Sequence, residues 1–201
     1  NGKGAGADEP LTEAEALDRT DHALQLLAAL SGLGQENMNR VAGWPFFDMG
    51  RRVERGVVTC RFARNFAGDD ATVDDLDVLI DLVDSQISYR SRYVVGFALA
   101  PVRDIVTLDP YNPRSVAFQV ARLAEHLAAQ PSLRADGLLE KPQRLVTSLA
   151  ADMTTMEATD LDAASILALE QRIMQLSEAI AARYFLHGPG AARPEKLTGL
   201  A

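Results

Sequence analysis

Charged and aromatic side chains stand unusually close together in residues 36–55. They include Glu36, Asn37, Arg40, Trp44, Asp48, Arg51, Arg52, Glu54 and Arg55. Residues three or four apart share a helix face, so Asp48 and the three arginines after it would lie together. A guanidinium that leaves water needs a carboxylate or carbonyl partner, and Glu36, Asp48 and Glu54 are nearest in sequence. This segment predicts either a buried ion-pair network that fixes helix order or a surface that binds a ligand or partner.

A second segment, Ser88-Tyr89-Arg90-Ser91-Arg92-Tyr93, has a similar composition. It is followed by Asp104, Asp109, Asn112, Arg114 and Ser115. If both segments face one cavity, three or more guanidinium groups would converge on a site suited to a phosphate or carboxylate ligand. Alternatively, Tyr89 and Arg92 cap the ends of neighbouring helices.

Four aspartates recur at a spacing of three and four, at Asp74, Asp77, Asp81 and Asp84. This spacing places them on one helix face, where they could hold Mg²⁺ together with a diphosphate. The alternative is a face in contact with water, since unpaired aspartates are mostly exposed. The second interpretation is favoured, because we find no other Asp-rich helix to oppose the first.

The other patterns that could indicate catalysis are weak. His22, His126 and His187 stand far apart in a chain without a Glu-x-x-His pair, which argues against a di-iron centre. Cys60, the single cysteine, fits a packed helix position better than a nucleophile. The glycines near both ends lack the spacing of a phosphate loop. We therefore predict no cofactor and no metal.

Composition narrows the class of protein further. A formal net charge of -8 argues against a nucleic-acid partner, which would need concentrated Lys and Arg. One cysteine allows no disulfide within the chain and favours a reducing compartment, so we expect a cytoplasmic protein. The longest apolar stretches, such as Val94 to Val102, are far shorter than the roughly 20 residues that a bilayer requires, so no membrane partner is expected.

The elements that position these residues are predicted to be helices throughout. Apolar residues recur at three and four from Leu11 onward, which indicates an all-α antiparallel bundle of about five to seven helices. The expected ranges are 12 to Gly32 or Gly34, 44–66, 72 toward 99, 101–108, 112–130, 142–156 and 162–185. Residues 1–10 read as a flexible linker and residues 188–201 as a disordered tail.

Several helix starts have recognisable caps. Thr12 with Glu15 and Thr72 with Asp75 have the spacing of capping boxes. Asn112 followed by Pro113 predicts another start, and so does Asp162. For the helix after residue 72, the predicted core face is Leu76, Leu79, Ile80, Val83 and Ile87.

These strings together carry a family resemblance. They are Glu36-Asn37-x-x-Arg40-x-x-Gly43-Trp44-x-Phe46, Gly50-Arg51-Arg52-x-Glu54-Arg55, Tyr89-Arg90-Ser91-Arg92-Tyr93, Asp109-Pro110-x-Asn112-Pro113-Arg114-Ser115-Val116-Ala117-Phe118-Gln119 and Arg183-Tyr184-Phe185. In order and spacing, the sequence resembles the alpha-E family of bacterial proteins over about residues 11–187. Pro45 departs slightly from the family pattern, and it suits the first turn of a helix.

The resemblance implies an all-helical module encoded with, or fused to, a circularly permuted ATP-grasp domain, and such partners suggest peptide or amide-bond synthesis. It also implies an upstream segment with its own Trp-x-x-Arg-x-x-Glu-Arg-like motif, so residues 11–187 would lack their N-terminal part. The motif positions carried over are Glu36, Asn37, Arg40, Trp44, Arg51, Glu54, Arg55, Tyr89, Arg92, Asn112 and Arg114.

Three functions follow as hypotheses. The first is a binding or scaffolding module, not catalytic alone, that presents an Arg/Glu/aromatic motif face to an ATP-grasp partner or a peptide substrate. The second is an enzyme subunit in which Glu36 or Glu54 acts as acid or base in amide-bond chemistry. The third is a Mg²⁺-dependent diphosphate-binding enzyme that uses the aspartate stripe.

Overall fold

A computed structural model describes residues 11–40, 43–94, 96–132, 134 and 136–185. The predicted linker, 1–10, and the predicted tail, 188–201, lie outside the described residues. The chain divides into two compact units, Asn1–Phe46 and Phe47–Ala201. The extent of the domain, residues 11–187, stays a prediction.

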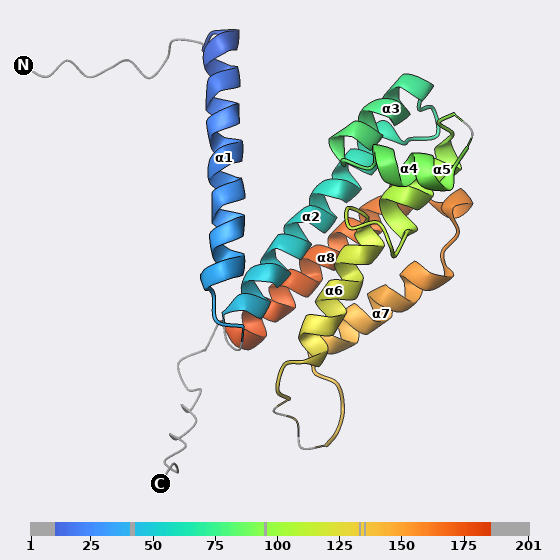
Figure 1. Cartoon of the computed structure of the whole chain (residues 1–201). Coiled ribbons are helices and arrows are strands. Elements are labelled where there is room, and N and C mark those ends of the chain that lie inside the picture. The colour runs from blue at the N-terminus through green and yellow to red at the C-terminus, as the bar shows by residue number, and fades with distance from the viewer. Residues whose placement is uncertain (1–10, 41–42, 95, 133, 135, 186–201) are drawn as a thin grey trace, which may run out of the picture. The chain divides into compact units, whose positions relative to one another are not determined.

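The all-α prediction is confirmed, because the described residues contain eight α-helices and no strand (Figure 1). The α-helices are α1 (Glu13–Asn37), α2 (Trp44–Phe66), α3 (Val73–Leu82), α4 (Gln86–Arg92), α5 (Leu99–Arg103), α6 (Val116–Ala128), α7 (Lys141–Thr155) and α8 (Ala163–Tyr184). Two short turns are added, the π-helix η1 (Asp104–Leu108) and the 3-10 helix η2 (Ala158–Asp160).

Both capping boxes form as predicted. The Thr12 backbone NH donates to the Glu15 carboxylate at 3.0 Å, and that of Thr72 donates to Asp75 at 2.9 Å. In each case the threonine hydroxyl accepts the return bond from the backbone. Asp162 also caps α8 as expected, accepting from the Ser165 NH at 2.7 Å.

Helix α1 runs past Gly32 and Gly34, where its end was expected. A glycine inside a helix costs only about 1 kcal/mol relative to alanine, too little to stop a 25-residue helix. The helix instead ends where Met38 leaves the helical conformation, its NH still bonded to the Gly34 carbonyl.

The predicted long helix from Thr72 toward Leu99 is wrong. It is divided into α3 and α4, because Asp84 takes a left-handed φ of 49°. The turn shifts the helical register, so Ile87, predicted in the core, is 87% exposed, whereas Val83 is buried. Beyond α4, Pro101 lies in the first turn of α5, which needs no NH there.

The start of α6 was predicted three residues too early. Ser115, and not Asn112, is the N-cap, and its hydroxyl accepts from the Phe118 NH at 3.0 Å. The Asn112 amide donates instead to the Ile105 carbonyl at 2.8 Å. The Asn112 side-chain oxygen accepts from the Arg114 NH at 3.1 Å, so it forms a local turn two residues on and does not cap the helix.

Within the second unit, α2, α6, α7 and α8 run alongside one another in alternating directions, and α3, α4 and α5 gather where α2 ends (Figure 1). Gly56 lets α2 come close to α8, because a Cβ there would lie 3.2 Å from Cδ1 of Ile173. The core includes Met49, Cys60, Ala63, Leu79, Ile80, Val102, Ile105, Leu123, Leu127, Leu149, Ile166 and Leu176.

No helix within the described ranges is both long enough and apolar enough to cross a bilayer.

Candidate functional site

Asp48, buried on α2, is the carboxylate on which several bases converge. His126 Nε2 lies 2.8 Å from its Oδ2, and Arg52 Nε donates to the same oxygen at 3.1 Å. Arg51 lies at 3.9 Å. Burial opposes ionisation of Asp48, but the hydrogen bonds from His126 and Arg52 outweigh it and lower its pKa. One carboxylate thus serves three basic side chains.

Arg55 lies one turn further along the same face of α2 and is half-buried. Among the described residues, its guanidinium has no hydrogen bond or ion pair. Burial, and then the like charges of its three arginine neighbours, lower the pKa of Arg55. Its sequence neighbour Glu54 is exposed and forms no ion pair in that part of the chain.

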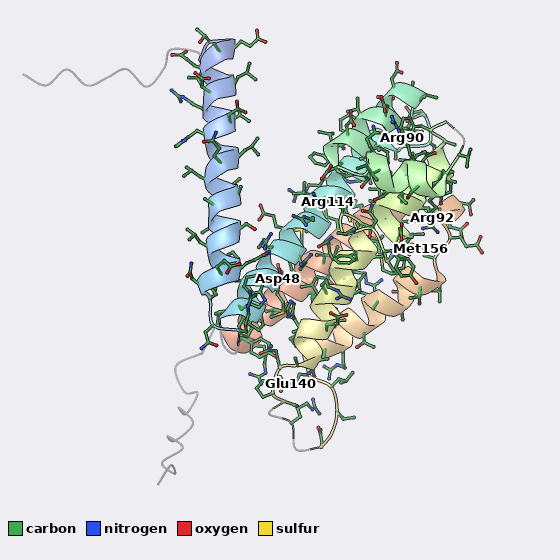
Figure 2. All side chains as sticks on the ribbon, in the orientation of Figure 1. Asp48, Arg90, Arg92, Arg114, Glu140 and Met156 are labelled. Carbon is green, nitrogen blue, oxygen red and sulfur yellow. The ribbon has the colours of Figure 1, made fainter. Side chains whose placement is uncertain are left out.

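Arg114 reaches this face from the loop before α6 (Figure 2). The Thr59 hydroxyl of α2 donates to its carbonyl oxygen at 3.5 Å, and its side chain pairs with Asp84 at 2.5 Å. Arg52 makes a parallel link, donating to the Gln119 side chain at 3.2 Å. We call Arg51, Arg52, Arg55 and Arg114 the arginine cluster.

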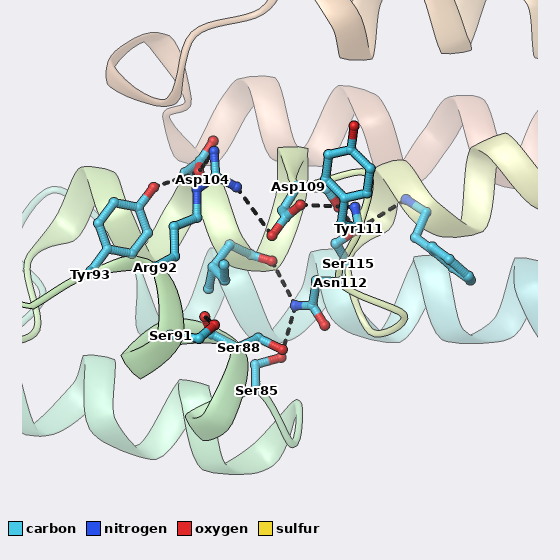
Figure 3. Close-up of polar contacts among 12 residues, drawn as sticks. Ser85, Ser88, Ser91, Arg92, Tyr93, Asp104, Asp109, Tyr111, Asn112 and Ser115 are labelled. Carbon is cyan, nitrogen blue, oxygen red and sulfur yellow. Dashed lines mark hydrogen bonds and ion pairs between the residues drawn. The ribbon is translucent and has the colours of Figure 1, made fainter.

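Arg92 does not join the arginine cluster but sits between two aspartates (Figure 3). Its guanidinium lies 3.2 Å from Asp104, the first residue of the π-helix η1, and 3.2 Å from Asp109, which follows the last residue of η1. Burial acts against it, but Asp104, Tyr93 and Asp109 together raise the pKa of Arg92. The Tyr93 hydroxyl donates to Asp104 at 2.6 Å, and burial followed by this bond raises the Tyr93 pKa to about 12.

A pocket of about 450 Å³ opens beside Arg92. Its lining residues are Ser88, Ser91, Arg92, Asp109, Pro110, Tyr111 and Asn112. Tyr111 is 88% exposed, and its backbone NH is held by the Asp109 carboxylate at 2.9 Å. We call this the Arg92 pocket. It offers hydroxyl groups, a charged network and an aromatic ring to a ligand or a partner side chain.

Two of the predicted site residues are structural. Besides the Ile105 carbonyl, the Asn112 amide donates to the Ser85 hydroxyl at 3.0 Å. The buried Tyr89 hydroxyl donates to the Gly96 carbonyl at 3.1 Å and accepts from the Ala98 NH at 3.4 Å, directly before α5. These bonds hold the backbone of Gly96 and Ala98 ahead of α5, which has no side-chain cap of its own in the described residues.

The four remaining motif residues, Glu36, Asn37, Arg40 and Trp44, belong to the first unit. Glu36 and Asn37 are exposed in the last turn of α1. The Arg40 guanidinium stacks over the Trp44 ring at 4.1 Å and donates to the Gln35 carbonyl. Within the second unit, the predicted partner Asp48 contacts Arg51 and Arg52.

Sequence reasoning missed His126 and Gln119 as members of the α2 network. Both come from α6, more than sixty positions beyond their α2 partners, so their spacing in sequence carried no signal. Gln119 did belong to a motif string, which was the available hint.

The aspartate stripe does not form a recognisable metal site. Asp77 and Asp81 both accept from the Gln86 amide, at 3.1 and 2.7 Å. In the described ranges, no group of three or more His, Cys, Asp or Glu side chains could hold a metal. Cys60 is buried, and burial raises the pKa of its thiol to about 12, so it stays protonated and unreactive.

Residues 5–185 match the sequence profile of the Alpha-E family, described as a predicted α-helical domain with a conserved ER motif. Glu54-Arg55 is the one Glu-Arg pair in the chain. Uncharacterised proteins of Mycobacterium bovis and Mycobacterium tuberculosis are 28% identical over 181 residues, which is 86% of this chain and 20% of each relative. The chain thus spans about a fifth of their length. No solved structure matches.

Proposed function

The chain belongs to the Alpha-E family, and we propose that it is a helical binding or scaffolding module of an ATP-grasp-linked system for peptide or amide-bond synthesis or modification. It presents its Arg/Glu/aromatic motif face to a partner or substrate. The resemblance of its motifs supports the link to ATP-grasp proteins. On this proposal it completes no catalytic cycle alone.

The observation that carries the proposal is the Arg92 pocket. It has an ordered floor, because Asn112 and Asp109 are buried and hydrogen-bonded. Its rim carries Tyr111, an aromatic ring left almost wholly in water. Rigid floors with exposed aromatic and arginine side chains are typical of binding hot spots.

The test is association with an ATP-grasp protein encoded beside this chain, measured by calorimetry with and without ATP. Tyr111→Ala should weaken binding by about tenfold or more, because truncating an aromatic hot-spot residue commonly costs over 1 kcal/mol. Ile87→Ala is the matched control, since Ile87 is equally exposed and lies on neighbouring α4. Equal affinities for wild type and both variants would contradict the proposal.

Product formation, measured beside association, distinguishes the binding module from the enzyme alternative. If Glu36 or Glu54 acted as acid or base, Glu36→Gln or Glu54→Gln would abolish product formation while association stayed intact. A binding module gives the reverse result, in which lost association is accompanied by normal single-turnover chemistry.

A further inference from the structure

We infer that the arginine cluster is a binding site for a doubly charged phosphate group, separate from the Arg92 pocket. It goes beyond the proposed function and does not depend on it, because none of the four arginines lines that pocket. The Glu-Arg pair that matches the family's ER motif supplies Arg55, the centre of this site.

The geometry is set by one helix and one loop. Arg51, Arg52 and Arg55 follow the spacing of a single face of α2, three and four residues apart. The backbone of Arg114 is held against the next turn of that face by the Thr59 hydroxyl. Gln119 fixes Arg52, and its own amide donates to the Pro113 carbonyl at 2.8 Å, which braces the loop that carries Arg114.

The charge of this face is not balanced within the described residues. Three of its four guanidinium groups, those of Arg51, Arg52 and Arg114, contact two carboxylates, Asp48 and Asp84, and Asp48 is shared with His126. The Arg114–Asp84 pair lies at the surface, with the Asp84 side chain 78% exposed, so an incoming anion can replace it at little cost. The half-buried Arg55 forms no ion pair with the residues that the structure describes, and its arginine neighbours repel it.

The surplus of about two positive charges selects the ligand class. A carboxylate brings one negative charge, whereas a phosphate monoester carries roughly -1.5 to -2 near neutral pH. Guanidinium groups also match phosphate oxygens through paired NH donors. A phosphate monoester therefore neutralises the arginine cluster where a single carboxylate would not.

Inorganic phosphate is the first probe, titrated into the chain by calorimetry at constant ionic strength, with acetate in parallel. Phosphate should bind and acetate should not. Arg55→Gln should weaken phosphate binding by about tenfold, as expected for the loss of a charge-assisted hydrogen bond. Arg90→Gln, which removes an equal charge from an exposed arginine of α4, should change nothing.

Equal affinity for acetate and phosphate, or an equal loss in Arg55→Gln and Arg90→Gln, would overturn the inference, since both outcomes indicate non-specific charge attraction. A second arm compares a nucleoside monophosphate with a phosphoserine peptide, and the tighter ligand identifies the source of the phosphate. Tyr111→Ala should retain phosphate binding, so a failed partner assay and a failed phosphate assay remain distinguishable.

Discussion

The Arg92 pocket and the arginine cluster use the same side chain in opposite ways. At the Arg92 pocket one guanidinium meets two carboxylates and a tyrosine, so its charge is over-compensated inside the protein. At the arginine cluster three of four guanidinium groups share two carboxylates, so positive charge is left over. A motif arginine with enough nearby carboxylates is neutralised and stabilises the fold, whereas an arginine in a cluster with too few carboxylates is left able to bind an anion.

The two regions should differ in how much each charged side chain contributes to the free energy of unfolding. Where charges are paired and partly buried, removing one leaves the others without a partner, and the folded state suffers. Where charges of one sign are crowded, removing one relieves repulsion and costs the fold little. Substitutions in the two regions should thus differ in their effect on the free energy of unfolding.

The largest effect on stability is expected at Asp48, the carboxylate that offsets part of the positive charge of the arginine cluster. Asp48→Asn leaves Arg52 and His126 without their anion and should lower the free energy of unfolding by about 3 kcal/mol at pH 7. Urea denaturation followed by circular dichroism measures the change. Asp70→Asn, at an exposed aspartate after α2, is the matched control and should have little effect.

This loss should depend on pH with a definite sign. The folded-state pKa of Asp48 is below its usual value of 3.8. Its stabilising contribution is therefore full above that value and is lost as pH falls through the folded pKa. The gap between wild type and Asp48→Asn should shrink in acid. If the difference in unfolding free energy between wild type and Asp48→Asn did not change as the pH fell, Asp48 would stabilise the fold without its charge.

A smaller effect is expected at Arg92. Arg92→Ala leaves Asp104 and the buried Asp109 without their shared cation and should lower the free energy of unfolding by about 2 kcal/mol. This loss is smaller than at Asp48, because Arg92 is 47% exposed and its charge is screened by water. Arg90→Ala, two residues earlier on α4, provides the control. If both variants unfold at the same urea concentration as wild type, Arg92 does not hold the π-helix in place, and the comparison fails.

The smallest effect on stability is expected at Arg55. Arg55→Gln removes a cation that has no ion pair among the described residues, so the free energy of unfolding should stay within about 0.5 kcal/mol of wild type. Added salt screens like charges and should stabilise wild type more than the variant in thermal melting. A loss above about 2 kcal/mol would reveal a structural partner and remove the contrast between the two regions.

Much of the fold follows from local sequence. Thr12, Thr72 and Asp162 cap the helices that their spacing predicts, since a cap is decided within one turn. The starts and ends of α2 and α7 agree with the expected ranges to within a residue. The core position predicted for Ile87 was wrong, because the left-handed conformation of Asp84 ends α3 and shifts the register of α4.

The sequence predicted which residues belong to the candidate sites, but not all of the ion pairs that those residues form. The sequence predicted that the guanidinium groups of residues 51–55 would need carboxylates, and Asp48 meets that need for Arg51 and Arg52. The sequence also left open that the Arg92 guanidinium would lie beside the α2 arginines. The structure instead pairs Arg92 with Asp104 and Asp109, because the π-helix brings both ends of residues 104–109 to α4.

Sequence by itself determined the all-helical class, the main caps and the identity of the charged motif residues, because helical periodicity and capping act over a few positions. Tertiary structure decided the pairs that are distant in sequence, such as Arg92 with Asp104 and Asp109, and Arg114 with Asp84. His126 reaches Asp48 across 78 positions, and Arg52 reaches Gln119 across 67. Charge balance depends on distances through space, so helix packing settled which arginines are neutralised and left Arg55 without a counterion among the described residues.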